Sequence, residues 1–170
     1  MRKQKGFSLI ELLIVVAIIL IIAAIAIPNL MRARMAANDS SAAASERSIV
    51  TAEVGYTSSY PTIGFTGLAR LGGPAPCTPG TLTACLIDNL LATANAGSGK
   101  SGFFFTAVAA TGGVGTVNTQ FETEGYPQSG QTGTKSYCAF EDGVIRQQVA
   151  GTITATGGRA NCLTLLPIAN

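Results

Sequence analysis

Residues 5–30 read KGFSLIELLIVVAIILIIAAIAIPNL, and inside this stretch sixteen apolar residues run without interruption from Leu12 to Ile27. As an α-helix, the segment from Phe7 to Ile27 would be about 32 Å long, which is enough to cross the hydrocarbon core of a membrane. The rest of the 170-residue chain is rich in Gly, Ser, Thr and Ala and has room for one globular domain. The sequence therefore predicts a membrane helix that carries one small head.

A cleaved secretory signal peptide is the alternative interpretation of this stretch, because basic residues precede the apolar run. Three features favour a retained helix instead. The run is longer than the apolar core of a signal peptide, no small-x-small cleavage site follows it promptly, and Glu11 lies near its start. The basic residues within positions 1–5 favour a cytoplasmic N-terminus, whereas Arg32 and Arg34 on the far side weaken that orientation.

The cysteines all follow the apolar run, at Cys77, Cys85, Cys138 and Cys162. An even number of cysteines beyond a membrane helix predicts disulfides formed in an oxidising compartment; buried free thiols are the alternative. Of the three possible pairings we favour Cys77 with Cys85 and Cys138 with Cys162, because each bridge then closes a loop within one region of the head. An oxidised head supports the cytoplasmic placement of the N-terminus.

The formal net charge of +2 belongs mostly to the start of the chain, where three of the eleven basic residues lie within the first five positions. Without residues 1–6, eight basic side chains remain against nine acidic ones, a net charge of −1. Elsewhere the sequence has no stripe of Lys and Arg with interleaved aromatic rings. It therefore predicts no dedicated nucleic-acid surface.

The head offers no recognisable set of catalytic or metal-binding residues. The chain has no histidine, and the only adjacent acidic residues of the head, Glu141 and Asp142, are too few for a Ca²⁺ loop. Residues 97–101, GSGKS, superficially resemble a phosphate-binding loop but lack its full spacing and a surrounding βαβ unit. We therefore predict neither an enzyme nor a site for a metal or cofactor.

Two short motifs flank the apolar run and carry a family resemblance. Residues 5–11, KGFSLIE, and residues 26–29, AIPN, resemble the N-terminus of type IV prepilins and of the related pseudopilins of type II secretion. The resemblance implies that prepilin peptidase cuts between Gly6 and Phe7 on the cytoplasmic side, and that Phe7 becomes the N-methylated first residue. It also implies that Glu11 of one subunit neutralises the Phe7 amine of a neighbouring subunit in a filament.

The chemistry of Glu11 is consistent with that role. A carboxylate near the centre of a membrane span costs about 2.5 to 3.5 kcal/mol on insertion scales, so Glu11 needs a partner. An α-amine has an ordinary pKa of about 7.7 to 8.0, and N-methylation keeps its positive charge. The alternative is that Glu11 lies in the first helical turns, where it complements the helix dipole, or at the level of the lipid headgroups.

Pro28 predicts a kink or local unwinding near residues 20–28, because proline removes a backbone hydrogen bond and clashes with the preceding turn. Many members of the family that this segment resembles have a helix-weakening Gly eight residues before this Pro, whereas this chain has Leu20. Extensive melting of the helix during assembly is therefore less expected here. Residues 29–60 are predicted to continue the helix, which Tyr60-Pro61 ends.

Beyond Pro28, the helix has a thin stripe of small and apolar residues that fits packing on a sheet. The stripe consists of Leu30, Ala33, Ala37, Ser41, Ala44, Ile49, Ala52 and Tyr56. Charged residues mark the other faces and are predicted to be solvated: Asp39, Glu46, Arg47 and Glu53.

The head pattern predicts an antiparallel sheet, because β-branched and aromatic residues alternate between glycine-containing turns. The expected strands are Phe103–Ala110, Gly115–Tyr126, Thr134–Glu141 and Val144–Val149, with later extended segments at Gly151–Ala155 and Leu163–Ile168. Asp142-Gly143 is predicted to form the last hairpin turn, and Leu86–Ala94 a short helix. The fold class is α+β: a long N-terminal helix packed on a small antiparallel sheet.

The resulting division of the chain is a leader at 1–6, a membrane and filament-core helix at 7–28, its amphipathic continuation at 29–60, and a head at 61–170. The resemblance implies a type IV pilin that anchors in the inner membrane and then polymerises with copies of itself. Prepilin peptidase, which also methylates, and the assembly machinery are its implied partners, and the uses are adhesion, motility or DNA uptake. The alternatives are a periplasmic pseudopilin and an anchored head that never polymerises. Paired cysteines and the absence of an acidic C-terminal metal loop favour the pilin.

Overall fold

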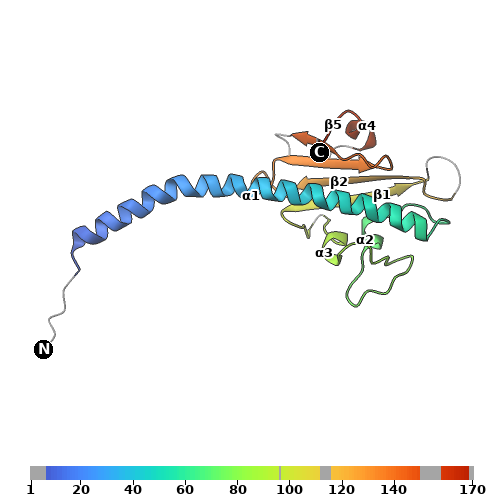
Figure 1. The fold of residues 1–170 in the computed structure, drawn as a ribbon, viewed down its shortest axis with the longest axis horizontal. Coiled ribbons are helices and arrows are strands. Elements are labelled where there is room, and N and C mark those ends of the chain that lie inside the picture. Colours follow the sequence, from blue (N-terminus) through green and yellow to red (C-terminus); the bar gives the residue numbers. More distant parts are fainter. Residues whose placement is uncertain (1–6, 96, 112–115, 150–157, 169–170) are drawn as a thin grey trace. The chain divides into compact units, whose positions relative to one another are not determined.

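The computed structural model describes residues 7–95, 97–111, 116–149 and 158–168. The predicted leader at 1–6 and the extended segment expected at 151–155 lie outside the described residues. The fold is α+β, as predicted, with a long N-terminal helix followed by a five-stranded antiparallel sheet and short helices. In order along the chain the elements are α1 (Leu9–Ser59), α2 (Leu68–Leu71), α3 (Asn89–Ala92), β1 (Phe103–Ala110), β2 (Gln120–Pro127), β3 (Lys135–Phe140), β4 (Arg146–Val149), α4 (Arg159–Cys162) and β5 (Leu166–Pro167) (Figure 1).

Helix α1 is one uninterrupted helix that contains Pro28 in its interior. Of the two outcomes expected near residues 20–28, local unwinding is not observed, because every residue of this segment is helical. The helix ends at Ser59, as expected from the Tyr60-Pro61 pair, and the Tyr60 N–H still donates a 2.8 Å hydrogen bond to the carbonyl of Tyr56. Contacts along the chain separate it into two compact units, residues 1–34 and residues 35–170.

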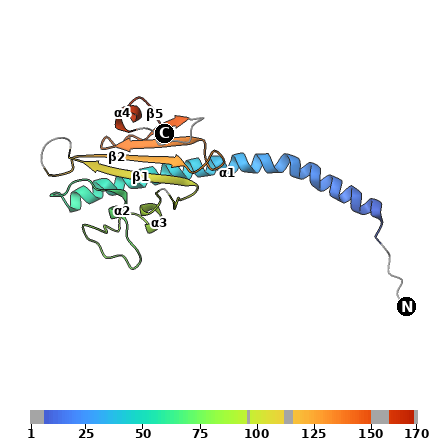
Figure 2. The same cartoon turned by 180° about the vertical axis from the view of Figure 1, so that it is seen from behind.

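Within the second unit, α1 packs along one face of the sheet (Figures 1 and 2). Ile49 and Tyr56 are fully buried there, together with Phe103 and Phe105 of β1 and Tyr137 of β3. The C-terminal half of the predicted stripe is therefore correct. Its first half is wrong: Leu30, Ala33, Ala37 and Ala44 are exposed, and the buried positions there are Asp39, Ala42, Ala43, Ser45 and Glu46.

The sheet has the strand order β1-β2-β3-β4-β5, and all neighbouring strands are antiparallel. β1 has the predicted bounds and pairs along its whole length with β2, from Phe103 opposite Pro127 to Ala110 opposite Gln120. The expected turn joins β3 to β4, where Gly143 has a φ of +71° that a side chain would disfavour. The connections between β2, β3 and β4 are short, whereas the connection from β4 to β5 contains α4.

Helices α2 and α3 lie beside β1, at the edge of the sheet (Figures 1 and 2). α3 lies within the segment predicted as a short helix but has only four residues. Its N-cap, Asp88, accepts a 2.7 Å hydrogen bond from the Leu91 N–H, which satisfies a donor in the first turn. In the loop between α2 and α3, Cys77 and Cys85 form a disulfide with their Cα atoms 6.0 Å apart.

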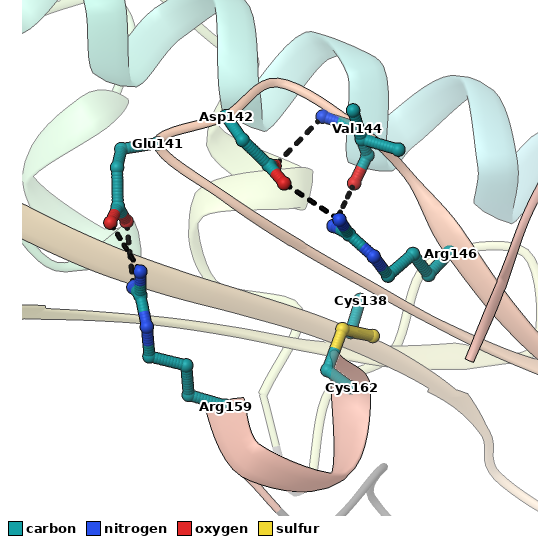
Figure 3. A network of polar contacts seen from close by, with 7 residues as sticks. All are labelled: Cys138, Glu141, Asp142, Val144, Arg146, Arg159 and Cys162. Carbon is teal, nitrogen blue, oxygen red and sulfur yellow. Dashed lines mark hydrogen bonds and ion pairs between the residues drawn. A yellow bond between two sulfur atoms is a disulfide. The ribbon is translucent and has the colours of Figure 1, made fainter. Parts of the chain in front are cut away.

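A second disulfide, Cys138–Cys162, attaches α4 to β3 (Figure 3). Both cysteines are fully buried and contact Phe140, in a small cluster separate from the main core. The guanidinium groups of Arg146 and Arg159 also lie over the Phe140 ring, 5.2 and 4.7 Å from its centroid. These contacts hold the C-terminal segment on the sheet. Both disulfides are the pairs favoured from the sequence.

Ion pairs reinforce this attachment (Figure 3). Arg159 donates two hydrogen bonds to the carboxylate of Glu141, one of them 2.8 Å long, and this interaction holds the pKa of Glu141 below its usual value. Arg146 pairs with Asp142 at 2.7 Å within the hairpin turn. Glu141 and Asp142, the only adjacent acidic residues of the head, therefore each bind an arginine.

Candidate functional site

The first turn of α1 places Glu11 next to the start of the helix. Phe7 and Ser8 precede the first helical residue, Leu9, and the backbone N–H of Ser8 donates a 2.9 Å hydrogen bond to Oε2 of Glu11. A glutamate three residues after the capping position satisfies a backbone donor that the helix itself cannot. Its negative charge also complements the positive end of the helix dipole. The local role considered for Glu11 in the sequence is thus present in the structure.

An apolar surface follows Glu11 along the first unit. Every large apolar side chain from Leu9 to Leu30 is exposed, and Phe7 is 79% exposed. This part of α1 is long and apolar enough to cross a membrane. Exposed apolar surface on this scale marks a region that contacts lipid or protein. The surface surrounds the helix on all sides, so it can serve several contacts at once.

The predicted site residues fall into separate groups. Phe7 and Glu11 lie at the start of α1, and Pro28 lies about 25 Å further along the helix at 1.5 Å per residue. The four cysteines belong to the second unit. Gly6, the predicted position before the cleaved bond, lies outside the described residues.

Residues 1–27 match the family model of the prokaryotic N-terminal methylation motif. The chain therefore carries this methylation motif. The match spans the predicted cleavage position, Phe7, Glu11 and the whole apolar run. The resemblance inferred from KGFSLIE and AIPN is confirmed over this segment.

Two relatives show the same likeness. The chain is 69% identical over 39 residues to the type IV wide pilus major component PilA4 of Thermus thermophilus, which is 23% of this chain and 30% of that protein. It is 45% identical over 56 residues to the type IV major pilin protein PilA of Myxococcus xanthus, which is 33% of this chain and 26% of that protein. The chain thus covers less than a third of either relative. No solved structure matches.

Three acidic residues of α1 that we expected to be solvated are buried against the head. Asp39, Glu46 and Glu53 have exposed fractions of 7%, 0% and 0%. They are spaced by seven residues, about two helical turns, and so share one face of the helix. The prediction that these charges face solvent is wrong for all three, whereas Arg47 is exposed.

Each of these carboxyl groups contacts a different segment. Asp39 accepts hydrogen bonds from the N–H and the hydroxyl of Thr134, at 3.0 and 2.7 Å. Glu46 accepts one from the hydroxyl of Thr123 on β2, and Glu53 accepts one of 3.0 Å from the N–H of Thr66. These hydrogen bonds therefore connect α1 to three places in the head: Asp39 to the start of β3, Glu46 to the middle of β2, and Glu53 to the segment that follows the helix.

Proposed function

We propose that this chain is a structural subunit of a type IV pilus-like filament. It is processed after Gly6, methylated at Phe7 and polymerised through the apolar part of α1. The observation that carries the proposal is the methylation motif at the start of a helix whose apolar side chains are exposed on every side. The two relatives, a wide pilus component and a major pilin, support the filament.

Burial of the apolar part of α1 stabilises the assembled filament in water. Burial of apolar surface is favourable by about 25 cal/mol per Å². Before assembly the membrane covers this surface, and in the filament the same segments of neighbouring subunits cover one another. One helix therefore serves first as an anchor and later as the core of the polymer.

The charge of Glu11 determines how an incoming subunit aligns with its neighbour. Cleavage after Gly6 would create a positively charged amine at Phe7, and methylation would keep that charge. In an apolar filament core, Glu11 of an incoming subunit has its best partner in the Phe7 amine of a neighbour, because an unpaired charge there is costly. The local hydrogen bond from Ser8 to Glu11 uses one carboxylate oxygen and leaves the other for this contact.

The two disulfides support a head outside the cytoplasm, since such bonds persist in oxidising compartments. The precursor then spans the inner membrane with its N-terminus in the cytoplasm, where the assembly machinery and the prepilin peptidase act on it. The finished filament is extracellular. Adhesion, motility and DNA uptake are the candidate uses of such a filament.

Crosslinking tests polymerisation through the helix. Two cysteines introduced by Val16→Cys and Ile18→Cys would lie inside the apolar run, about 200° apart around the helix, whereas the four native cysteines are already paired. Oxidation of cells that express this double variant is expected to give a ladder of multimers well beyond dimers, because each chain then has two free thiols that can form disulfides with two different neighbours. Only monomers and dimers would contradict assembly through α1. A ladder confined to the cell envelope would instead assign the chain to a pseudopilus.

A further inference from the structure

The carboxyl groups of Glu46 and Glu53 are buried, and in the described part of the chain each has hydrogen-bond donors for only one of its two oxygens. Oε2 of each accepts a hydrogen bond, but within the described part of the chain Oε1 of each is buried and has no hydrogen-bond partner. Asp39 differs, because both of its oxygens accept hydrogen bonds from Thr134. A buried carboxylate oxygen without a donor is costly, whereas a protonated carboxyl group carries no charge to stabilise.

Within the described residues, the surroundings of Glu46 provide no ion-pair partner of opposite charge. Oε1 points at Gly125 of β2, where an added Cβ would be only 2.7 Å away, and Phe105 of β1 closes the same space. The charged group that acts on Glu46 from β2 is Glu124, which has the same sign. For Glu53, burial disfavours the charged form, whereas the hydrogen bond from the Thr66 N–H favours it. Among the described residues, no lysine or arginine forms an ion pair with either glutamate.

We propose that Glu46 and Glu53 form a proton-dependent lock between α1 and the head. With both carboxyl groups protonated, α1 stays docked on β2 and on the segment around Thr66. When alkaline conditions remove the protons, two negative charges are left buried between α1 and the head, and the docking weakens. The lock lies in the second unit and does not depend on polymerisation.

The expected pH window follows from the burial of the two groups. Burial raises the pKa of Glu46 from 4.5 to about 8, against the hydrogen bond from Thr123, and Glu124 raises it further. Burial raises the pKa of Glu53 to about 7, against the hydrogen bond from Thr66. The unfolded chain loses these protons above about pH 4.5, while the folded chain keeps them. Their stabilisation is therefore complete below pH 4.5, declines as the pH rises, and is lost once the pH passes about 7 for Glu53 and about 8 for Glu46.

The test is the pH dependence of unfolding of the full chain in detergent micelles between pH 5 and 9. For the wild type, we expect the unfolding equilibrium constant to rise about tenfold per pH unit for each of the two carboxyl groups that is still protonated in the folded chain but already ionised in the unfolded chain. The double variant Glu46→Gln/Glu53→Gln, which mimics the protonated state, should lose this slope. Asp88→Asn is the matched control. Asp88 has a lowered pKa, so it stays ionised above pH 5, and Asn still caps α3, so the wild-type slope should remain.

Hydrogen exchange at pH 9 locates the effect, since both proteins are compared at one pH. Residues 39–56 of α1 should exchange more slowly in the double variant than in the wild type. A flat wild-type profile from pH 5 to 9, or a double variant that keeps the slope, would overturn the proposal. If the double variant does not fold, ¹³C NMR titration of the wild-type glutamates decides the question. Two carboxyl groups that titrate above pH 6 support the lock, and none above pH 6 rejects it.

Discussion

The backbone N–H of Ser8 donates a 2.9 Å hydrogen bond to Oε2 of Glu11, the residue three positions later in the first turn of α1. This contact gives Glu11 a structural task within its own chain. The proposed filament gives it a second task, the neutralisation of the Phe7 amine of a neighbouring subunit. The hydrogen bond needs only an acceptor, whereas the neutralisation needs a negative charge, so the two tasks can be separated by mutation.

We predict that Glu11→Gln abolishes filaments as completely as Glu11→Ala does. Gln keeps an acceptor for the Ser8 N–H, since Glu and Gln both serve at this capping position, but it carries no charge. Loss of the cap costs only about 0.5 to 2 kcal/mol of helix stability, which is small for a helix of this length. Electron microscopy of sheared cell-surface material measures the outcome. Normal filaments from Glu11→Gln but not from Glu11→Ala would show that the cap is what matters.

Gly6→Val is predicted to leave the precursor uncut. A β-branched side chain at this position hinders the close approach of the backbone to a protease, which glycine permits. Mass spectrometry of the membrane fraction should then find chains that begin at Met1, and filaments should be missing. Gln4→Ala is the control within the leader and should be processed normally. Wild-type processing of Gly6→Val would refute the assignment of the cleaved bond.

The two disulfides should differ in their contribution to stability. Cys138–Cys162 closes a loop three times as long in sequence as Cys77–Cys85, with separations of 24 and 8 residues. In the loop-entropy account, serine replacement of the longer pair costs about 3 to 4 kcal/mol, roughly 1 kcal/mol more than replacement of the shorter one. Thermal unfolding followed by circular dichroism gives the comparison. A larger loss of stability in the Cys77/Cys85 variant than in the Cys138/Cys162 variant would contradict this prediction.

The buried face of α1 can be tested with two matched truncations. Ile49 is fully buried and Val54 is 55% exposed, and both are β-branched residues whose change to Ala favours helix to a similar extent. Ile49→Ala should lower the free energy of unfolding by about 2 to 5 kcal/mol, whereas Val54→Ala should change it by about 0.5 kcal/mol or less. Equal losses in chemical denaturation would mean that α1 packs on the sheet through another face.

The parts of the fold that depend on local pattern were predictable from the sequence. Phe103–Ala110 alternates around buried Phe103 and Phe105, and its predicted bounds agree with β1. Tyr60-Pro61 fixes the end of α1, because proline restricts the residue before it. The N-terminal motif was equally readable, because its residues lie next to one another in the chain. In each case the deciding residues are neighbours in sequence.

The orientation of α1 on the sheet was only half predictable. Charged residues are usually solvated, so Glu46 and Glu53 were expected to face water. Their partners Thr123 and Thr66 lie 77 and 13 positions further along the chain, and no local pattern connects them. Helix α4 was missed for a similar reason. It has four residues, and the disulfide from Cys162 to Cys138 holds it in place rather than its own helix propensity.

Mass spectrometry of the N-terminus, on fibres sheared from the cell surface and viewed by electron microscopy, tests the central claim most directly. We predict abundant extracellular fibres whose subunit begins with N-methylated Phe7. The same N-terminus confined to the cell envelope would move the chain to the periplasmic pseudopilins. A chain that still begins at Met1 and stays in the membrane would contradict assembly through α1 altogether.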